Sequence, residues 1–161
     1  MKENAGFTLI ELMFTLALAA IVITLGVPGF RNFIESNQAT AAANGLLAAL
    51  NTARSESVTR NLPVAVCASS DGTSCTGKDN WAVGWIVFTD GGPNPGTVDP
   101  GETVLRVGSP LSTGTLTTTV SYVRYMPTGL TAGSNNLKFD LTLGKQTRTI
   151  ALTATGQASA G

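Results

Sequence analysis

Few residues of this chain could carry out chemistry. Its 161 residues include 10 Lys and Arg, 10 Asp and Glu, two Cys and no His. Without His, a Ser-His-Asp triad, a Cys-His nucleophile pair and a His-rich zinc site are all excluded. Ser and Thr are abundant, but no Ser-x-x-Lys element offers them a lysine base. The sequence therefore predicts no catalytic residue, no metal site, no cofactor and a protein that is not an enzyme.

The ionisable residue with the most unusual setting is Glu11. It is the only charge between Phe7 and Phe30, and it directly precedes Leu12–Phe30, a run of 19 uncharged residues. At about 1.5 Å rise per residue, this run forms a helix of roughly 28 Å, close to the thickness of a hydrocarbon core. Since no Lys or Arg lies within a helical turn of Glu11, we expect its carboxylate to find a partner on another molecule.

Two ordinary interpretations of the apolar run fit poorly. A cleaved secretory signal has a basic start and a shorter apolar run of about 7–15 residues. Here the start is nearly neutral, because Lys2 is offset by Glu3, and a carboxylate lies inside the run. An ordinary membrane anchor explains the length of the run but not its carboxylate.

The N-terminal sequence suggests a third interpretation. The stretch Gly6-Phe7-Thr8-Leu9-Ile10-Glu11-Leu12 resembles the signature of type IV prepilins and type II secretion pseudopilins. This resemblance implies that prepilin peptidase cleaves between Gly6 and Phe7 on the cytoplasmic side and that the new Phe7 amine is methylated. It also implies that Glu11 pairs with the Phe7 amine of an adjacent subunit and so sets the axial register of a filament.

Later segments extend the resemblance to the FimT/FimU and pseudopilin H (GspH) group of minor subunits. The stretch Ala53-Arg54-Ser55-Glu56-Ser57 is similar to the Ala-Arg-Ser-Glu-Ala motif that ends the helix of that group, with Ser57 in place of the last Ala. The runs Gly84-Trp85-Ile86-Val87-Phe88 and Glu102-Thr103-Val104-Leu105-Arg106 are also similar to that group. The resemblance therefore covers most of the chain.

The spacing of apolar residues predicts one long helix. Small and apolar residues recur at intervals of three and four from Ala39 to Ala53, so this face should pack on a globular domain. Pro63 should end the helix near Arg60. Because Pro28 removes one backbone donor, we expect a bend or local melting of the helix at 26–29.

Beyond Leu62 the period of the pattern changes to two. The expected strands are 62–67, 81–89, 103–107, 115–124, 137–142 and 147–153. One long helix followed only by strands predicts an α+β fold, here pilin-like, in which an antiparallel sheet packs on the second half of the helix.

The expected organisation has four parts. They are a prepilin leader (1–6), a transmembrane and filament-core helix (7–30), its amphipathic continuation (31–60) and a periplasmic β-rich domain (61–161). The resemblance implies a single-pass inner-membrane protein that enters a pilus or pseudopilus after assembly. The resemblance also implies that the protein is a minor type IV pilin that takes part in initiating pilus assembly. The alternative function is that of an H-type pseudopilin of type II secretion. The implied partners are other minor and major pilins or pseudopilins, prepilin peptidase and the inner membrane.

Cys67 and Cys75 are eight residues apart. Placement outside the cytoplasm favours a disulfide over two independent thiols. Closing so short a loop stabilises the fold by roughly 2.5 kcal/mol on the chain-entropy estimate. A metal site is disfavoured, because two thiolates do not complete a tetrahedral shell.

Two further kinds of site are also disfavoured. Asp90, Asn94, Asp99 and Glu102 lie in an acidic loop, but their spacing does not fit a calcium-binding EF-hand, and we expect a solvated loop. Some FimT-type subunits bind DNA through a Gly-Arg-x-Arg element, which here corresponds to Gly156-Gln157-Ala158-Ser159 and lacks both arginines. The nearby cations are Lys138, Lys145 and Arg148. Because phosphate binding needs clustered cations, nucleic acid is not expected as a partner, and DNA uptake is the least favoured function.

Overall fold

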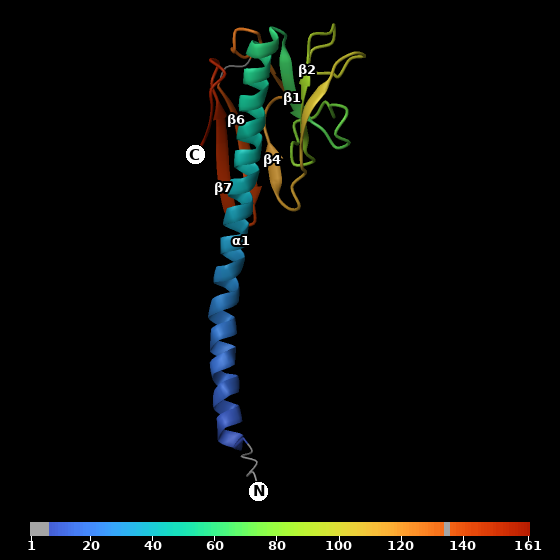
Figure 1. Ribbon diagram of the computed structural model, residues 1–161. Helices are drawn as coiled ribbons and strands as arrows, with labels where there is room; N and C mark the ends of the chain where they lie inside the picture. The colour runs from blue at the N-terminus through green and yellow to red at the C-terminus, as the bar shows by residue number, and fades with distance from the viewer. Residues whose placement is uncertain (1–6, 134–135) are drawn as a thin grey trace.

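The computed structural model describes residues 7–133 and 136–161 and consists of one long helix that carries a head of β-strands (Figure 1). The predicted leader, including Gly6, lies outside the described residues. Helix α1 (Leu9–Arg60) has 52 residues, and only its second half lies against the head. The strands are β1 (Val64–Ala68), β2 (Trp85–Thr89), β3 (Val104–Gly108), β4 (Thr115–Thr117), β5 (Tyr122–Tyr125), β6 (Leu137–Leu143), β7 (Gln146–Leu152) and β8 (Ala158–Ala160).

Both ends of α1 are specified locally. Thr8 is the N-cap, and it forms a reciprocal capping box with Glu11 that satisfies two backbone donors. The helix ends at Arg60, as Pro63 predicted, and Asn61 follows in the left-handed conformation with φ 52°. The expected melting at 26–29 is wrong, because α1 is helical throughout that segment. A proline removes only one backbone hydrogen bond, which a helix of this length tolerates.

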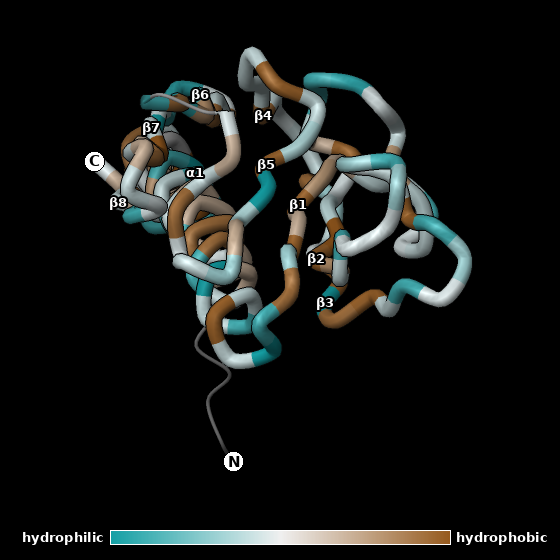
Figure 2. Tube along the Cα trace, turned by 90° about the horizontal axis from the view of Figure 1, so that it is seen from above, coloured by the Kyte–Doolittle hydropathy of each residue, from teal (hydrophilic) through white to brown (hydrophobic). Residues whose placement is uncertain are grey.

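The strands form two antiparallel sheets instead of the single sheet that we expected. The first sheet has the order β3-β2-β1-β5, and the second has the order β4-β6-β7-β8. Figure 2, a view from above, shows β1–β3 on one side of α1 and β6–β8 on the other. The expected strand 115–124 is in fact two strands, because the chain leaves the second sheet after β4 and enters the first sheet at β5. The short strand β8 was not predicted.

The expected strand 81–89 begins later, at Trp85. Residues 81–84 form a turn in which the Gly84 N–H donates to the Trp81 carbonyl (3.2 Å). Gly84 has φ 109°, and a Cβ there would lie 2.9 Å from the carbonyl oxygens of Ser69 and Gly108. The glycine is therefore required by both the backbone conformation and the close approach of two other segments.

One hydrophobic core joins the helix to both sheets. The face of α1 from Ala39 to Ala53 is buried in it, as the spacing predicted. Trp81 contacts Phe139 of the second sheet edge-on, with ring centroids 5.0 Å apart. A second, smaller cluster lies on the other face of the first sheet and includes Cys67 and Phe88. Because both faces of the first sheet are covered, β1 is buried at every residue.

Candidate assembly site

The first half of α1 has no partner within the described chain. All described side chains from Phe7 to Ile34 are exposed, including 16 large apolar ones. By length and composition, α1 is able to cross a membrane. In Figure 1 this half extends away from the head as a free rod. Exposing so much apolar surface to water is unfavourable, so this half must lie in lipid or against other protein.

Glu11 lies at the start of this exposed half and is only partly satisfied. Its Oε2 atom accepts hydrogen bonds from Thr8 N (3.0 Å) and from Thr8 Oγ1 (2.8 Å). Its Oε1 atom has no donor among the residues that the structure describes. Phe7, one helical turn away, is 89% exposed. One oxygen of Glu11 is therefore still able to accept a hydrogen bond, and its pairing with a cation on another subunit stays a prediction.

The segment 53–57 fastens the packed half of α1 to the head. The Arg54 Nε–H donates to the Gly129 carbonyl (3.0 Å), and the buried Ser57 hydroxyl donates to the Met126 carbonyl (3.1 Å). Glu56 pairs with Arg60 on the exposed side, where an ion pair contributes little. This segment carries the resemblance to the helix-ending motif, and its buried polar groups hold the loop after β5.

Gly156 belongs to the same junction. A Cβ at this residue would overlap the Gly129 carbonyl oxygen and lie 3.1 Å from the Tyr125 ring. The segment 156–159, which we compared with a DNA-binding element, thus forms the packed turn into β8 and the strand itself.

The cations near that segment do not form one patch. In the register of β6 with β7, Lys138 pairs with Ala151, whereas Arg148 pairs with the buried Leu141. Since successive side chains of a strand point to opposite faces, Lys138 and Arg148 lie on opposite faces of the second sheet. Lys145 lies in the turn between the two strands, with its backbone N–H 3.3 Å from a Glu35 oxygen.

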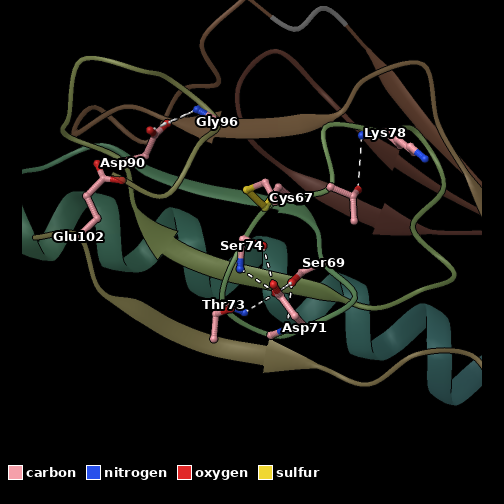
Figure 3. Close-up of a disulfide and its surroundings, with 12 residues drawn as sticks. Cys67, Ser69, Asp71, Thr73, Ser74, Lys78, Asp90, Gly96 and Glu102 are labelled. Atoms are coloured by element: carbon pink, nitrogen blue, oxygen red, sulfur yellow. Dashed lines mark hydrogen bonds between the residues drawn. A yellow bond between two sulfur atoms is a disulfide. The ribbon is translucent and has the colours of Figure 1, made fainter. Parts of the chain in front are cut away.

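The predicted disulfide between Cys67 and Cys75 is present, with the two Cα atoms 5.7 Å apart (Figure 3). It joins the end of β1 to a loop that is organised around Asp71. The Asp71 carboxylate accepts hydrogen bonds from the backbone N–H groups of Thr73 and Ser74, both at 2.8 Å, and from the Ser74 hydroxyl. These bonds lower the pKa of Asp71, the Ser74 hydroxyl contributing most.

The acidic loop contains a buried ion pair that the sequence analysis missed. Asp90 is fully buried, and its Oδ2 atom lies 2.8 Å from Arg124 Nε of β5. Burial raises the pKa of Asp90 to about 6, although the Gly96 N–H and the Arg124 cation act in the opposite direction. Since Arg124 is 34 residues away in an alternating strand, no local spacing indicated this partner.

The other two carboxylates of this loop, those of Glu102 and Asp99, accept hydrogen bonds from residues of the same loop. Glu102 accepts from the backbone N–H groups of Gly92 and Asp99, each at 2.8 Å. Asp99 accepts from the backbone N–H and the side-chain amide of Asn94. The three carboxylates of the acidic loop therefore accept hydrogen bonds from the backbone of the loop itself, whereas Asn94 acts as a donor.

A long helix with a free apolar half, and a second half packed on antiparallel sheets, defines the pilin fold. Two crystal structures of the type IV minor pilin FimU from Pseudomonas aeruginosa have this fold. One matches with a TM-score of 0.61 and 21% identity over 80% of this chain and 92% of that chain. The other matches with a TM-score of 0.59 and 19% identity over 76% and 91%.

Sequence comparison identifies the family within this class. The family described as type II transport protein GspH matches residues 42–156, and the prokaryotic N-terminal methylation motif matches residues 1–27. The chain therefore belongs to the GspH family and is a type IV pilin-like protein. It is also 32% identical, over 101 residues, to the type IV major fimbrial protein FimA of Dichelobacter nodosus. That match spans 60% of this chain and 60% of the length of FimA.

Proposed function

We propose that this chain is a minor pilin that takes part in initiating the assembly of a type IV pilus. The observation that carries the proposal is the exposed half of α1, which begins with a half-satisfied carboxylate and offers apolar side chains on every side. Such a helix is suited to the core of a helical filament, where neighbouring helices replace lipid around it. Its role is structural, in keeping with the family, and no enzymatic step is assigned to it.

Processing comes first in this proposal. Prepilin peptidase cleaves between Gly6 and Phe7, and the new Phe7 amine is methylated. The match of residues 1–27 to the N-terminal methylation motif supports this step. Cleavage places a positive charge at the exposed end of α1, one helical turn from Glu11.

The Glu11 carboxylate then selects the register of the subunit. Its Oε1 atom, which has no donor among the described residues, receives the Phe7 amine of an adjacent subunit. Both ions are poorly solvated in an apolar filament core, so leaving either one unpaired is costly. Pairing them favours one axial position of the incoming subunit over all others.

Before assembly the subunit is anchored in the inner membrane by α1, with its head in the periplasm. The apolar exposed half supports the anchoring. The Cys67–Cys75 disulfide supports the location of the head, because disulfides persist in the oxidising periplasm. Other minor and major pilins are its partners in the filament.

A deletion of this protein in its host tests the proposal against its alternative. We expect fewer surface pili and reduced twitching, both restored by the full-length chain. An H-type pseudopilin would instead leave pili intact and block the export of folded proteins through type II secretion. Normal piliation in a clean deletion would contradict the minor-pilin role. The family description keeps the pseudopilin as the second candidate.

A further inference from the structure

A groove runs between α1 and the end of β3 with the segment that follows it, on the part of the head nearest the free half of α1. It has a volume of about 420 Å³ and is open to solvent. One wall is the face of α1 that carries Ala41, Ala42 and Gly45, and the other wall is residues 106–112. Trp85 of β2 lies between the two walls.

Two glycines set the shape of this groove. A Cβ at Gly108 of β3 would overlap the Trp85 indole, so the ring lies directly across the strand at that residue. On the helix side, a Cβ at Gly45 would lie 3.5 Å from Trp85 Cζ2. The indole is 4% exposed and packs on the core, so the floor of the groove is rigid.

The groove is suited to an apolar helix. Its floor and far wall are mainly apolar and include Trp85, Leu111 and Leu143, and the lining contains one cation, Arg106, and no carboxylate. Beyond Gln38, the α1 wall consists of the small residues Ala41, Ala42 and Gly45, which allow the backbone of a second helix to approach closely.

We propose that this groove receives part of the exposed N-terminal helix, residues 9–34, of a second pilin-type neighbour, one displaced further along the filament than the subunit whose Phe7 amine pairs with Glu11. The face of α1 that forms one wall of the groove is continuous with its exposed half. Val27, Ile34, Gln38, Ala41 and Gly45 follow one another at intervals of seven, four, three and four, so they share one face of α1. A helix that packs along the exposed half of α1 therefore continues directly into the groove.

Lipid does not reach the groove. Its lower end, Gln38, lies eight residues beyond Phe30, the last residue of the uncharged run. At about 1.5 Å per residue, this places the groove about 12 Å or more outside the hydrocarbon core. The apolar surface must then be covered by protein, and the N-terminal helix is the apolar element that each subunit of such a filament carries. The inference rests on the proposed function, because it requires a filament.

Photo-cross-linking tests the occupant. The full-length chain carries p-benzoylphenylalanine in place of Gln38, an exposed residue with a long side chain at the lower end of the groove, and irradiation is done on assembled filaments. The expected product is a peptide from the N-terminal apolar helix of this or another pilin-type subunit, identified by mass spectrometry. The same replacement at Thr147, which is exposed on the second sheet, should not give that product. A product from a head domain, or none, would overturn the proposal.

A substitution that fills the groove gives an independent measurement. Ala41→Phe should reduce the amount of subunit in sheared filaments by about tenfold, the effect of overpacking an interface by one large side chain. Thr40→Phe is the matched control, since Thr40 is also exposed and lies about 100° around the helix. Both variants should reach the membrane at wild-type levels.

The outcomes separate this inference from the proposed function. If wild type and both variants enter filaments equally, or if both variants are lost equally, the groove is not the docking site while the filament role stands. If the wild-type chain is itself absent from filaments, the proposed function fails and this inference fails with it.

Discussion

The two halves of α1 are built for different neighbours. From residue 9 to 34 the helix exposes apolar side chains all round, whereas from residue 35 to 60 one face is buried against both sheets of the same chain. The buried face is made mainly of Ala and Leu, and the free half is rich in Leu, Ile, Val and Phe. The more hydrophobic half is thus the one without an internal partner, which indicates that its burial occurs only in lipid or in an assembly.

The two regions also treat a carboxylate differently. In the head, Asp90 is fully buried and forms an ion pair with Arg124 of the same chain. At the free end, Glu11 uses one oxygen to cap its own helix and leaves the other without a donor among the described residues. An internal partner stabilises the folded subunit, whereas an unfilled acceptor is available to a second molecule. The difference distinguishes a carboxylate that is satisfied within the fold from one that can still accept a donor.

The largest effect is expected at Glu11. Glu11→Ala should lower incorporation into filaments by about two orders of magnitude, because it leaves the incoming Phe7 amine unpaired in an apolar core. Membrane insertion and the unfolding of the head should not change. The measurement is the amount of subunit in sheared filaments relative to membranes. Glu11→Asp, which retains the charge, should recover part of the loss, and normal assembly of Glu11→Ala would disprove the pairing.

The next effect distinguishes the two halves by stability. Leu50 is fully buried, so Leu50→Ala should lower the free energy of unfolding of the head by about 3 kcal/mol. Leu16 is 62% exposed, and Leu16→Ala should change that free energy by less than about 0.5 kcal/mol. Urea unfolding of the full chain in detergent micelles, followed by the fluorescence of Trp81 and Trp85, measures both. Equal losses would mean that the halves are not independent.

The smallest effect concerns pH. The pKa of Asp90 is raised from 3.8 to about 6, so the folded head binds more protons than the unfolded chain between about pH 4 and 6. Its contribution to stability should therefore fall as the pH rises through that window, by about 1–2 kcal/mol. Urea unfolding at a series of pH values should show that Asp90→Asn removes this slope.

Asp71→Asn is the control for the pH experiment. Hydrogen bonds lower the pKa of Asp71, so its contribution is complete above its ordinary pKa and is lost as the pH falls below about 4. Its substitution should change the acid side of the curve and leave the slope between pH 4 and 6 in place. A wild-type slope that persists in Asp90→Asn would show that another group titrates there.

Local signals were sufficient for the helix and the disulfide. Pro63 predicted the end of α1, and the three- and four-residue spacing predicted its buried face. The pairing of Cys67 with Cys75 was expected from their short separation outside the cytoplasm. In each case the cause lies within a few residues of the effect, which is why the sequence alone indicates it.

Non-local partners explain the errors. The run 115–124 alternates like one strand, but its two ends pair with different sheets, β4 with β6 and β5 with β1. Strand β8 is too short to show a period, and it exists because β7 offers it an edge. Arg124 was not recognised as the partner of Asp90 for the same reason, since nothing near either residue indicates the other.

The sequence by itself determined that the chain begins with a helix of membrane length, interrupted by one carboxylate, and that a β-rich head follows it. These features are periodic and local, so composition and spacing express them directly. Only the tertiary structure decided that the head has two sheets, that Arg54 and Ser57 fasten the helix to the head, and that Trp85 forms the floor of a groove beside α1. These features depend on contacts between segments that are far apart in the sequence. Strand pairing and core packing determine those contacts, and local spacing does not reveal them.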